Sequence, residues 1–235
     1  MESYNLPSFP SEYSSIHICL FSNVTNSAEI KKRLVQAAIT QGEEGDQLRR
    51  EVDFGFLEAD VLVSKEHLLT SIMTTLLYAF PSSSNASLSA RNSTAPGPIP
   101  NLDPLTISES PESQVRFEPK TRTHNLHSEL LLSLSPNNNI TDSIRRHGIS
   151  DKTTNLVIVK ITDGQQTPEN VYSSIMNIVE GELVNLDKIE EVTDWAKVDK
   201  IYKLSELNSL KSSNPDVLSK KRTAVVSAVG VKNVM

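Results

Sequence analysis

The chain has 235 residues, with 23 lysines and arginines against 29 aspartates and glutamates, so its formal charge is −6 at neutral pH. Only 37% of the residues are hydrophobic and 5% are aromatic. No stretch reaches the roughly 20 apolar residues that a membrane span needs, residues 1–10 lack the apolar run of a secretory signal, and the lone Cys19 excludes an internal disulfide or a thiolate metal cluster. We therefore expect an intracellular soluble protein of one domain, and its net acidity argues against bulk DNA binding.

The first forty residues predict a strand followed by a helix. Residues 15–21 form the short apolar run of a buried strand. Asn26, with Glu29 three positions later, marks a helix start. Apolar residues then recur at helical spacing, namely Ile30, Leu34, Ala37 and Ala38. Residues 41–51 are strongly polar and predict a break in the regular structure.

A second strand and helix follow. Residues 54–63 predict a strand that is interrupted at residues 59–60. Ser64 is a good N-cap for a strong helix. The apolar face of that helix consists of Leu68, Leu69, Ile72, Met73, Leu76 and Leu77. The helix is therefore expected to cover one face of a sheet.

Residues 81–119 differ from everything around them. They hold seven of the twelve prolines and nine serines, with few large apolar side chains. Such a stretch cannot bury enough surface to offset an ordering cost of roughly 1–2 kcal/mol per residue. We therefore predict a disordered insertion that loops out of a single folded domain spanning residues 1–235.

The second half of the chain again mixes helices with one clear strand. Helices are predicted at residues 126–134, 142–147 and 167–179, from Asp194 onward, and at residues 216–231. Residues 155–161 are nearly all apolar and β-branched, which favours a central strand. The predicted fold class is α/β (α+β), a single compact domain with a small mixed β-sheet packed against several helices.

Familiar catalytic motifs are missing from the sequence. There is no Gly-x-Gly-x-x-Gly or Walker loop and no Gly-x-Ser-x-Gly elbow. His124 and His127 are three residues apart, but without a third ligand at suitable spacing we interpret them as surface residues and predict no metal or cofactor. Cys19 lies in an apolar run, where thiols are usually inert. These observations predict a protein that is not an enzyme.

Two features indicate binding surfaces. In residues 120–126, two cations, two hydroxyls and an amide precede a helix, where backbone N–H groups favour anions such as phosphate. Capping by Thr123 or Asn125, with solvated cations, explains this run equally well. The second feature is the C-terminal helix, whose apolar residues cover a wide arc: Val225, Val226, Ala228 and Val229. Docking on a partner and burial within the chain both account for such an arc.

Residues 121–129, residues 134–140 and residues 148–149 resemble the signature of the PRPK-binding-protein (TPRKB) family, the small subunit of the KEOPS, or EKC, complex. Shorter matches are residues 9–10, the helix at Asn26, residues 201–204 and residues 225–231. The resemblance covers nearly the whole chain except residues 41–51 and 81–119. The insertion is similar to those that fungal members acquire.

This resemblance implies a non-catalytic subunit. The small subunit of the family binds the N-terminal lobe of the complex's RIO-like atypical kinase and captures the single-stranded CCA end of tRNA. A sister subunit then makes threonylcarbamoyl adenosine beside the anticodon. By position, the residues implied for RNA binding are Lys120, Arg122, Thr123 and Asn125, and those implied for kinase binding are Val225, Ala228, Val229, Ile30 and Leu34.

Core burial explains Ile30 and Leu34 equally well. The resemblance also implies a nuclear and cytoplasmic location that extends to telomeric chromatin, a role in telomere maintenance, and no contact with a membrane.

Two alternative functions come from other classes of protein. A stand-alone module for single-stranded RNA would need several aromatic side chains on which bases stack. Phe117 is the only aromatic candidate near the basic residues 120–126. An enzyme predicts a nucleophile–base pair or a metal cluster.

Overall fold

The computed structural model describes residues 1–81, 118–208 and 216–232. The predicted disordered insertion at 81–119 lies, except for its two ends, outside the described residues. Within them, the five strands are β1 (Glu2–Asn5), β2 (Ser15–Ser22), β3 (Gly55–Glu58), β4 (Leu156–Thr162) and β5 (Glu182–Val184). They form one sheet in the order β1-β2-β4-β3, with β5 also paired to β2.

The predicted α/β class is confirmed, with one correction to the sheet. All four strand pairings are antiparallel, so this sheet is not the mixed one that we predicted. The prediction of a central apolar strand is confirmed, because β4 lies between β2 and β3. The short strands β1 and β5 were missed because neither carries an apolar run.

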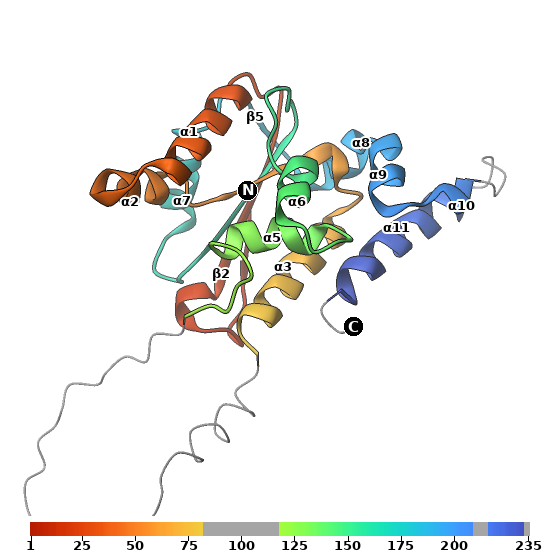
Figure 1. The fold of residues 1–235 in the computed structure, drawn as a ribbon, viewed down its shortest axis with the longest axis horizontal. Coiled ribbons are helices and arrows are strands. Elements are labelled where there is room, and N and C mark those ends of the chain that lie inside the picture. The colour runs from red at the N-terminus through yellow and green to blue at the C-terminus, as the bar shows by residue number, and fades with distance from the viewer. Residues whose placement is uncertain (82–117, 209–215, 233–235) are drawn as a thin grey trace, which may run out of the picture.

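Helices cover both faces of the sheet (Figure 1). Along β2, Ile16, Ile18 and Leu20 pack on the face covered by α3 (Lys65–Ala79) and α5 (Leu126–Leu134). Cys19 and Phe21 point to the opposite face, where α1 (Ser27–Ile39) and α7 (Pro168–Met176) supply the apolar partners. This alternation follows from the two-residue period of a strand. The sheet is therefore buried between two layers of helices.

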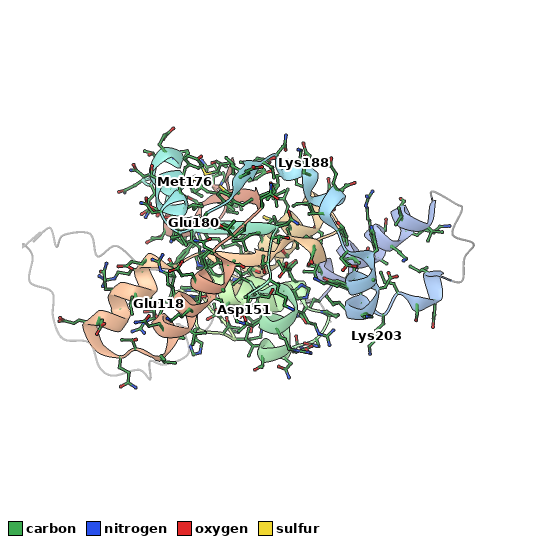
Figure 2. All side chains as sticks on the ribbon, turned by 90° about the horizontal axis from the view of Figure 1, so that it is seen from above. Glu118, Asp151, Met176, Glu180, Lys188 and Lys203 are labelled. Atoms are coloured by element: carbon green, nitrogen blue, oxygen red, sulfur yellow. The ribbon has the colours of Figure 1, made fainter. Side chains whose placement is uncertain are left out.

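The remaining helices lie around this core. They are α2 (Gly42–Glu51), α6 (Ile140–His147), α8 (Ile189–Val192), α9 (Trp195–Tyr202), α10 (Ser205–Asn208) and α11 (Asp216–Gly230), with 3-10 turns at Ser11–Tyr13, Ala59–Val61 and Leu186–Lys188. Figures 1 and 2 place α1 and α2 at one end of the molecule and α10 and α11 at the other. The strand predicted at residues 54–63 ends at Glu58, where the second 3-10 turn begins, and it does not resume at residues 62–63.

The predicted polar break at residues 41–51 is wrong, because this segment is the helix α2. Its charges fit a helix, since Glu43 and Glu44 lie in the first turn and two arginines lie in the last. Arg49 fixes α2 against α1 by donating to the carbonyl oxygens of Ala37 (2.9 Å) and Thr40 (3.0 Å). These contacts between helices replace the apolar stripe that the sequence lacks.

A third apolar cluster fixes the C-terminal helix. Val225 of α11 packs with Val63, Val198 and Leu204. On its other flank α11 runs along α3, where Gly230 lies close to Thr70. The helix is therefore an integral part of the domain.

Candidate functional site: the basic segment and the C-terminal helix

The basic segment, residues 120–125, connects the two helices that cover one face of the sheet. The backbone N–H of Lys120 donates to the carbonyl oxygen of Ala79 at the end of α3 (3.0 Å). Asn125 is the N-cap of α5, and its Oδ1 accepts from the backbone N–H of Ser128 (2.8 Å). The capping interpretation of Asn125 is thus confirmed, and the segment is held at both ends.

Arg122 is held by a carboxylate of its own chain. Its Nε and Nη2 atoms lie 2.7 and 2.6 Å from Oε1 of Glu129, and its backbone N–H donates to Oε2 (2.9 Å). Thr123 donates its hydroxyl to the same Oε2 (3.2 Å). Glu129 is 0% exposed. These charge-assisted hydrogen bonds therefore offset the free energy that its carboxylate loses when it is removed from water. Arg122 is therefore not the solvated cation that the capping interpretation assumed.

The guanidinium of Arg122 also stacks on an aromatic ring. Its Cζ lies 4.1 Å from the centroid of the Tyr78 ring, and Nζ of Lys120 lies 6.0 Å from the same centroid. The side chain of Arg122 is 29% exposed. The contacts that fix it engage Nε and Nη2, and none among the described residues engages Nη1. The segment therefore presents an oriented guanidinium edge beside an exposed lysine.

His127 is not the surface residue that we predicted. Its ring is buried, with Nδ1 3.0 Å from Oδ1 of Asp53. Nε2 accepts from the backbone N–H of Ile161 (3.3 Å), so Nδ1 carries the proton and donates to Asp53. The other oxygen of Asp53 accepts from Nζ of Lys160 (2.8 Å). Burial alone would raise the pKa of Asp53, but the hydrogen bond from His127, together with the charge and hydrogen bond of Lys160, lowers it well below its usual value.

We did not predict the roles of three residues near the basic segment, of which only Glu129 lies within the signature at residues 121–129. They are Tyr78, Glu129 and Lys232. Nζ of Lys232 donates to the carbonyl oxygens of Leu132, Ser135 (2.7 Å) and Asn137 (2.8 Å) at the end of α5. Burial, followed by the charge of Arg122, lowers the pKa of Lys232 to about 8. The end of α11 is thus bonded to the helix that begins at the basic segment.

The apolar residues implied for kinase binding are mostly internal in this structure. Val225 and Val229 are 0% and 1% exposed, and Ile30 is buried in the cluster between the sheet and α1. Leu34 is half-buried against the same cluster. Ala228 alone of the five is exposed. Two apolar side chains of the C-terminal helix region are exposed: Leu218 near the start of α11 and Val231 directly after its end.

Other chemistry in the described residues is limited. Burial raises the pKa of the Cys19 thiol to about 11, which fits the predicted inert core residue. No group of three or more His, Cys, Asp and Glu side chains in the described ranges is arranged to hold a metal ion. Among the same residues, no helix is long and apolar enough to span a membrane. Phe117, the one predicted stacking residue, lies outside the described ranges.

The sequence that forms these two helix layers about an antiparallel sheet matches a family of kinase-binding proteins. Residues 21–233 match the family model described as kinase binding protein CGI-121. The chain belongs to this family, which confirms the family assignment made from residues 121–129 and 134–140.

Three of the relatives that this chain resembles are fungal proteins that carry one name. It is 57% identical over 240 residues to "EKC/KEOPS complex subunit CGI121" of Cryptococcus neoformans var. neoformans serotype D, an alignment that covers 100% of both chains. It is 30% identical to the protein of the same name from Candida albicans, with 89% of this chain and 87% of the relative covered. The Aspergillus fumigatus protein is 27% identical, with coverages of 89% and 86%.

Proposed function

We propose that this protein is a non-catalytic subunit of the KEOPS, or EKC, complex, which binds the complex's RIO-like kinase and recruits the CCA end of tRNA for threonylcarbamoyl-adenosine formation beside the anticodon. The observation that carries the proposal is the full-length match to a protein named as a subunit of this complex. Contact with the transferase subunit is indirect in this proposal. The nuclear and cytoplasmic location, with its extension to telomeric chromatin and telomere maintenance, belongs to the same proposal.

The geometry of the basic segment supports contact with RNA phosphates. Arg122 is fixed by Glu129 and Tyr78, so little side-chain freedom is lost when its open edge meets a phosphate oxygen. Lys120 is exposed beside it. Thr123 is engaged within the segment, with its hydroxyl directed to Asn125 O and Glu129, so its role in this proposal is to hold Arg122 in place. Asn125 presents its amide nitrogen next to the cap that its oxygen makes.

The exposed side of α11 supports contact with the kinase. Val225 and Val229 anchor the helix from within, and Ala228 lies on the outside between the exposed ends. In this proposal the two valines act by positioning the helix, while Ala228 touches the kinase. Ile30 and Leu34 serve the core of the domain.

The RNA contact is tested by changing an exposed charge. Lys120→Glu should weaken binding of tRNA by about tenfold, an effect of about 1.4 kcal/mol, because a phosphate contact is replaced by repulsion. Lys152→Glu is the matched control, since Lys152 is also exposed but lies on a turn after α6. Binding should be measured with intact tRNA and with tRNA that lacks its CCA end. Equal affinity of both tRNAs, or equal effects of both substitutions, would contradict the proposed RNA site.

The kinase contact is tested at the exposed alanine. Ala228→Arg should abolish co-purification with the kinase, because a long charged side chain occupies the docking face, and it should leave the fold intact. Ser173→Arg, on the exposed side of α7, is the matched control. Undisturbed co-purification of the Ala228→Arg protein would remove α11 from the interface. The kinase and RNA tests are independent, so either contact can fail alone.

A further inference from the structure

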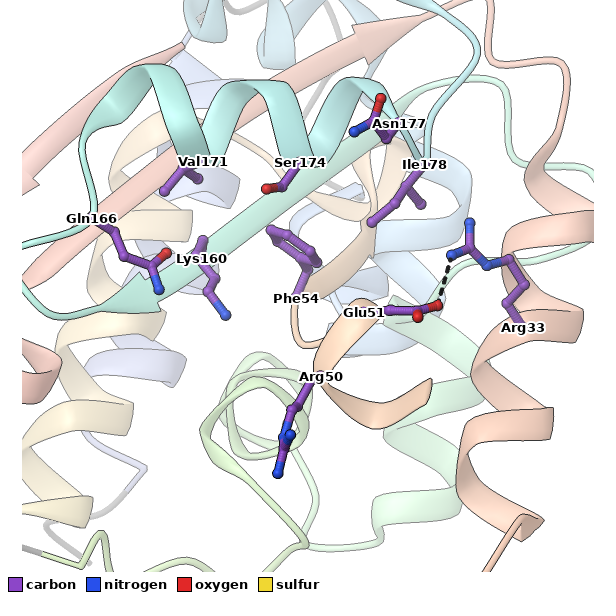
Figure 3. A pocket seen from close by; sticks show the side chains of 10 residues that line it. All are labelled: Arg33, Arg50, Glu51, Phe54, Lys160, Gln166, Val171, Ser174, Asn177 and Ile178. Carbon is purple, nitrogen blue, oxygen red and sulfur yellow. Dashed lines mark ion pairs between the residues drawn. The ribbon is translucent and has the colours of Figure 1, made fainter. Parts of the chain in front are cut away.

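A pocket of about 430 Å³ lies at the end of the molecule that carries α1 and α2 (Figure 3). Three cations from three different elements line it: Arg33 of α1, Arg50 of α2 and Lys160 of β4. None of its lining residues belongs to the basic segment or to α11. It was not predicted, because its cations are 17 to 127 residues apart and one of them lies on the helix that we missed.

The charges around this pocket leave two guanidinium groups available. Arg50 makes no ion pair with any described residue. Arg33 forms an ion pair with Glu51, marked in Figure 3, but at 3.7 Å the two groups are farther apart than in a hydrogen bond. Lys160 is neutralised by Asp53 at 2.8 Å. The lining carries three cations and one acid, Glu51, and the further acid Asp53 pairs with Lys160, so the net charge of these groups is positive and both arginines can bind an anion.

The walls of the pocket add an apolar surface and amide groups. Figure 3 shows the ring of Phe54 between Lys160 and Glu51. Val171 and Ile178 line the same side, and both are buried in the core next to it. Gln166 and Asn177 contribute side-chain amides on the opposite ends of the opening. The pocket thus combines cations for a phosphate with an apolar wall, in which Nζ of Lys160 lies 5.0 Å from the centroid of the Phe54 ring, and with amide donors and acceptors that suit a heterocyclic base.

The position of α2 gives this pocket a fixed shape. Arg49 joins α2 to two carbonyl oxygens at the end of α1, so the neighbouring Arg50 and the facing Arg33 are held on two helices that are joined together. A pocket of a few hundred cubic ångströms is the size that small-molecule ligands fill. A nucleoside monophosphate is of this size and carries both required groups.

We propose that this pocket binds a nucleotide, with its phosphate held by Arg33 and Arg50 and its base against the wall formed by Phe54, Val171 and Ile178. The nucleotide is either a free nucleoside monophosphate or one unit of a single-stranded RNA. An RNA strand could reach both this pocket and the basic segment, because the two sites are connected through Asp53. Asp53 bonds to Lys160 in the pocket wall and to His127, two residues beyond the basic segment.

The test uses the full chain and two probes, AMP and a short oligoadenylate, titrated by isothermal calorimetry. Arg50→Gln and Arg33→Gln should each weaken binding about fivefold to tenfold, since each removes one charge-assisted contact to phosphate. Ser174→Trp fills the pocket without altering a charge and should abolish binding. Arg145→Gln is the matched control, because Arg145 is exposed on α6 and Asp142 keeps its second partner, Arg146.

Each outcome bears on the pocket. Binding of AMP that falls in the pocket variants supports the proposal with a free nucleotide as ligand. Binding of the oligoadenylate alone, with the same sensitivity, supports it with RNA as the source. Failure of both probes to bind, or equal binding by the pocket variants and the wild-type protein, overturns it. Loss of tRNA binding in Lys120→Glu, with no effect of the pocket variants on either probe, would overturn the pocket and leave the proposed function standing.

Discussion

The basic segment and the C-terminal helix were both predicted as binding surfaces, yet their key side chains differ in exposure to solvent. Arg122 is joined to a buried carboxylate and still keeps an open edge at the surface. Val225 and Val229 are wholly enclosed by their own chain. The difference lies in what each side chain can do for folding. A cation loses its water when buried, whereas an apolar side chain is stabilised by about 1.5–3 kcal/mol when fully buried.

A sequence pattern therefore identifies charged contact residues more directly than apolar ones. A charged side chain that is not needed inside stays near the surface, so its presence in a motif is informative. An apolar residue on a terminal helix first serves the core, and only its exposed neighbours can meet a partner. The following predictions test this contrast between the two regions.

The largest effect is expected in the C-terminal helix. Val225→Asp should lower the free energy of unfolding by about 3–5 kcal/mol, because it places an unpaired charge in the cluster with Val63 and Val198. Ala228→Asp, one turn further on the exposed side, should change it by less than about 0.5 kcal/mol. Urea unfolding of both variants measures the difference. Equal stabilities would mean that α11 is not docked as described.

The basic segment should respond to loss of its internal carboxylate. Glu129→Ala should cost about 2–4 kcal/mol of unfolding free energy, since it leaves the N–H of Arg122 and its guanidinium without their partner. The same change should weaken tRNA binding, because Arg122 loses its fixed orientation. Urea unfolding and tRNA titration provide the two measurements. Glu118→Ala is the control at an exposed acid near the same segment, and a loss of similar size there would contradict the specific role of Glu129.

Lys232 connects the two regions, and its removal should have a smaller effect. Lys232→Met should cost about 1–2 kcal/mol, because the carbonyl oxygens of Leu132, Ser135 and Asn137 lose a charged donor. The loss should concentrate in α11, where amide hydrogen exchange should become faster. Lys200→Met on α9, at an exposed position, should leave that exchange unchanged. Unaltered exchange in both variants would show that the lysine does not fasten the helix.

The smallest effect concerns pH and two buried histidines, one on α3 and one on α6, that both lie beside Tyr202 of α9. Burial lowers the pKa of His67 and of His147 to about 3, whereas an unfolded histidine titrates near 6.5. Between pH 6.5 and 3 the unfolded chain therefore binds more protons, so the stability that is present above pH 6.5 is lost as the pH falls. His147→Phe should make this loss shallower by up to about 1 kcal/mol per pH unit.

Urea unfolding at pH 7 and pH 5 measures that slope. Both ring nitrogens of His147 are buried and have no hydrogen-bond partner among the described residues, so the somewhat larger, apolar phenyl ring leaves no polar partner unsatisfied at pH 7. His124→Phe, at an exposed position, should leave the slope unchanged. Identical slopes for the wild-type protein and His147→Phe would contradict the role of this residue.

Local signals predicted much of the fold. Ser64, Asn125 and Asp194 each cap the helix that follows them, as expected from their side chains. Asn26 also precedes a helix, but its amide instead joins Ile178 O and Glu180 N across the chain. The polar helix α2 could not be predicted, because its stability depends on Arg49 reaching carbonyl oxygens of another helix.

The candidate sites were less predictable than the fold for a related reason. The sequence identified Arg122 and Asn125, since both lie within one short run. It did not identify Tyr78 or Lys232 as neighbours, because they are 44 and 110 residues away from Arg122 and carry no periodic signal. The same holds for the pocket at Arg33 and Arg50. Contacts of this kind depend on how the helices pack, which no local pattern encodes.

The hydrogen bond between Lys120 and Ala79 has a consequence for how this gene product can vary. The two positions lie within hydrogen-bond distance of each other, so the number of amino acids between them can change without shifting the helices and strands described on either side. Evolution can lengthen or trim that stretch freely, and an experimenter can replace it with a reporter. A fluorophore inserted there would sit next to the arginine edge and register the arrival of nucleic acid.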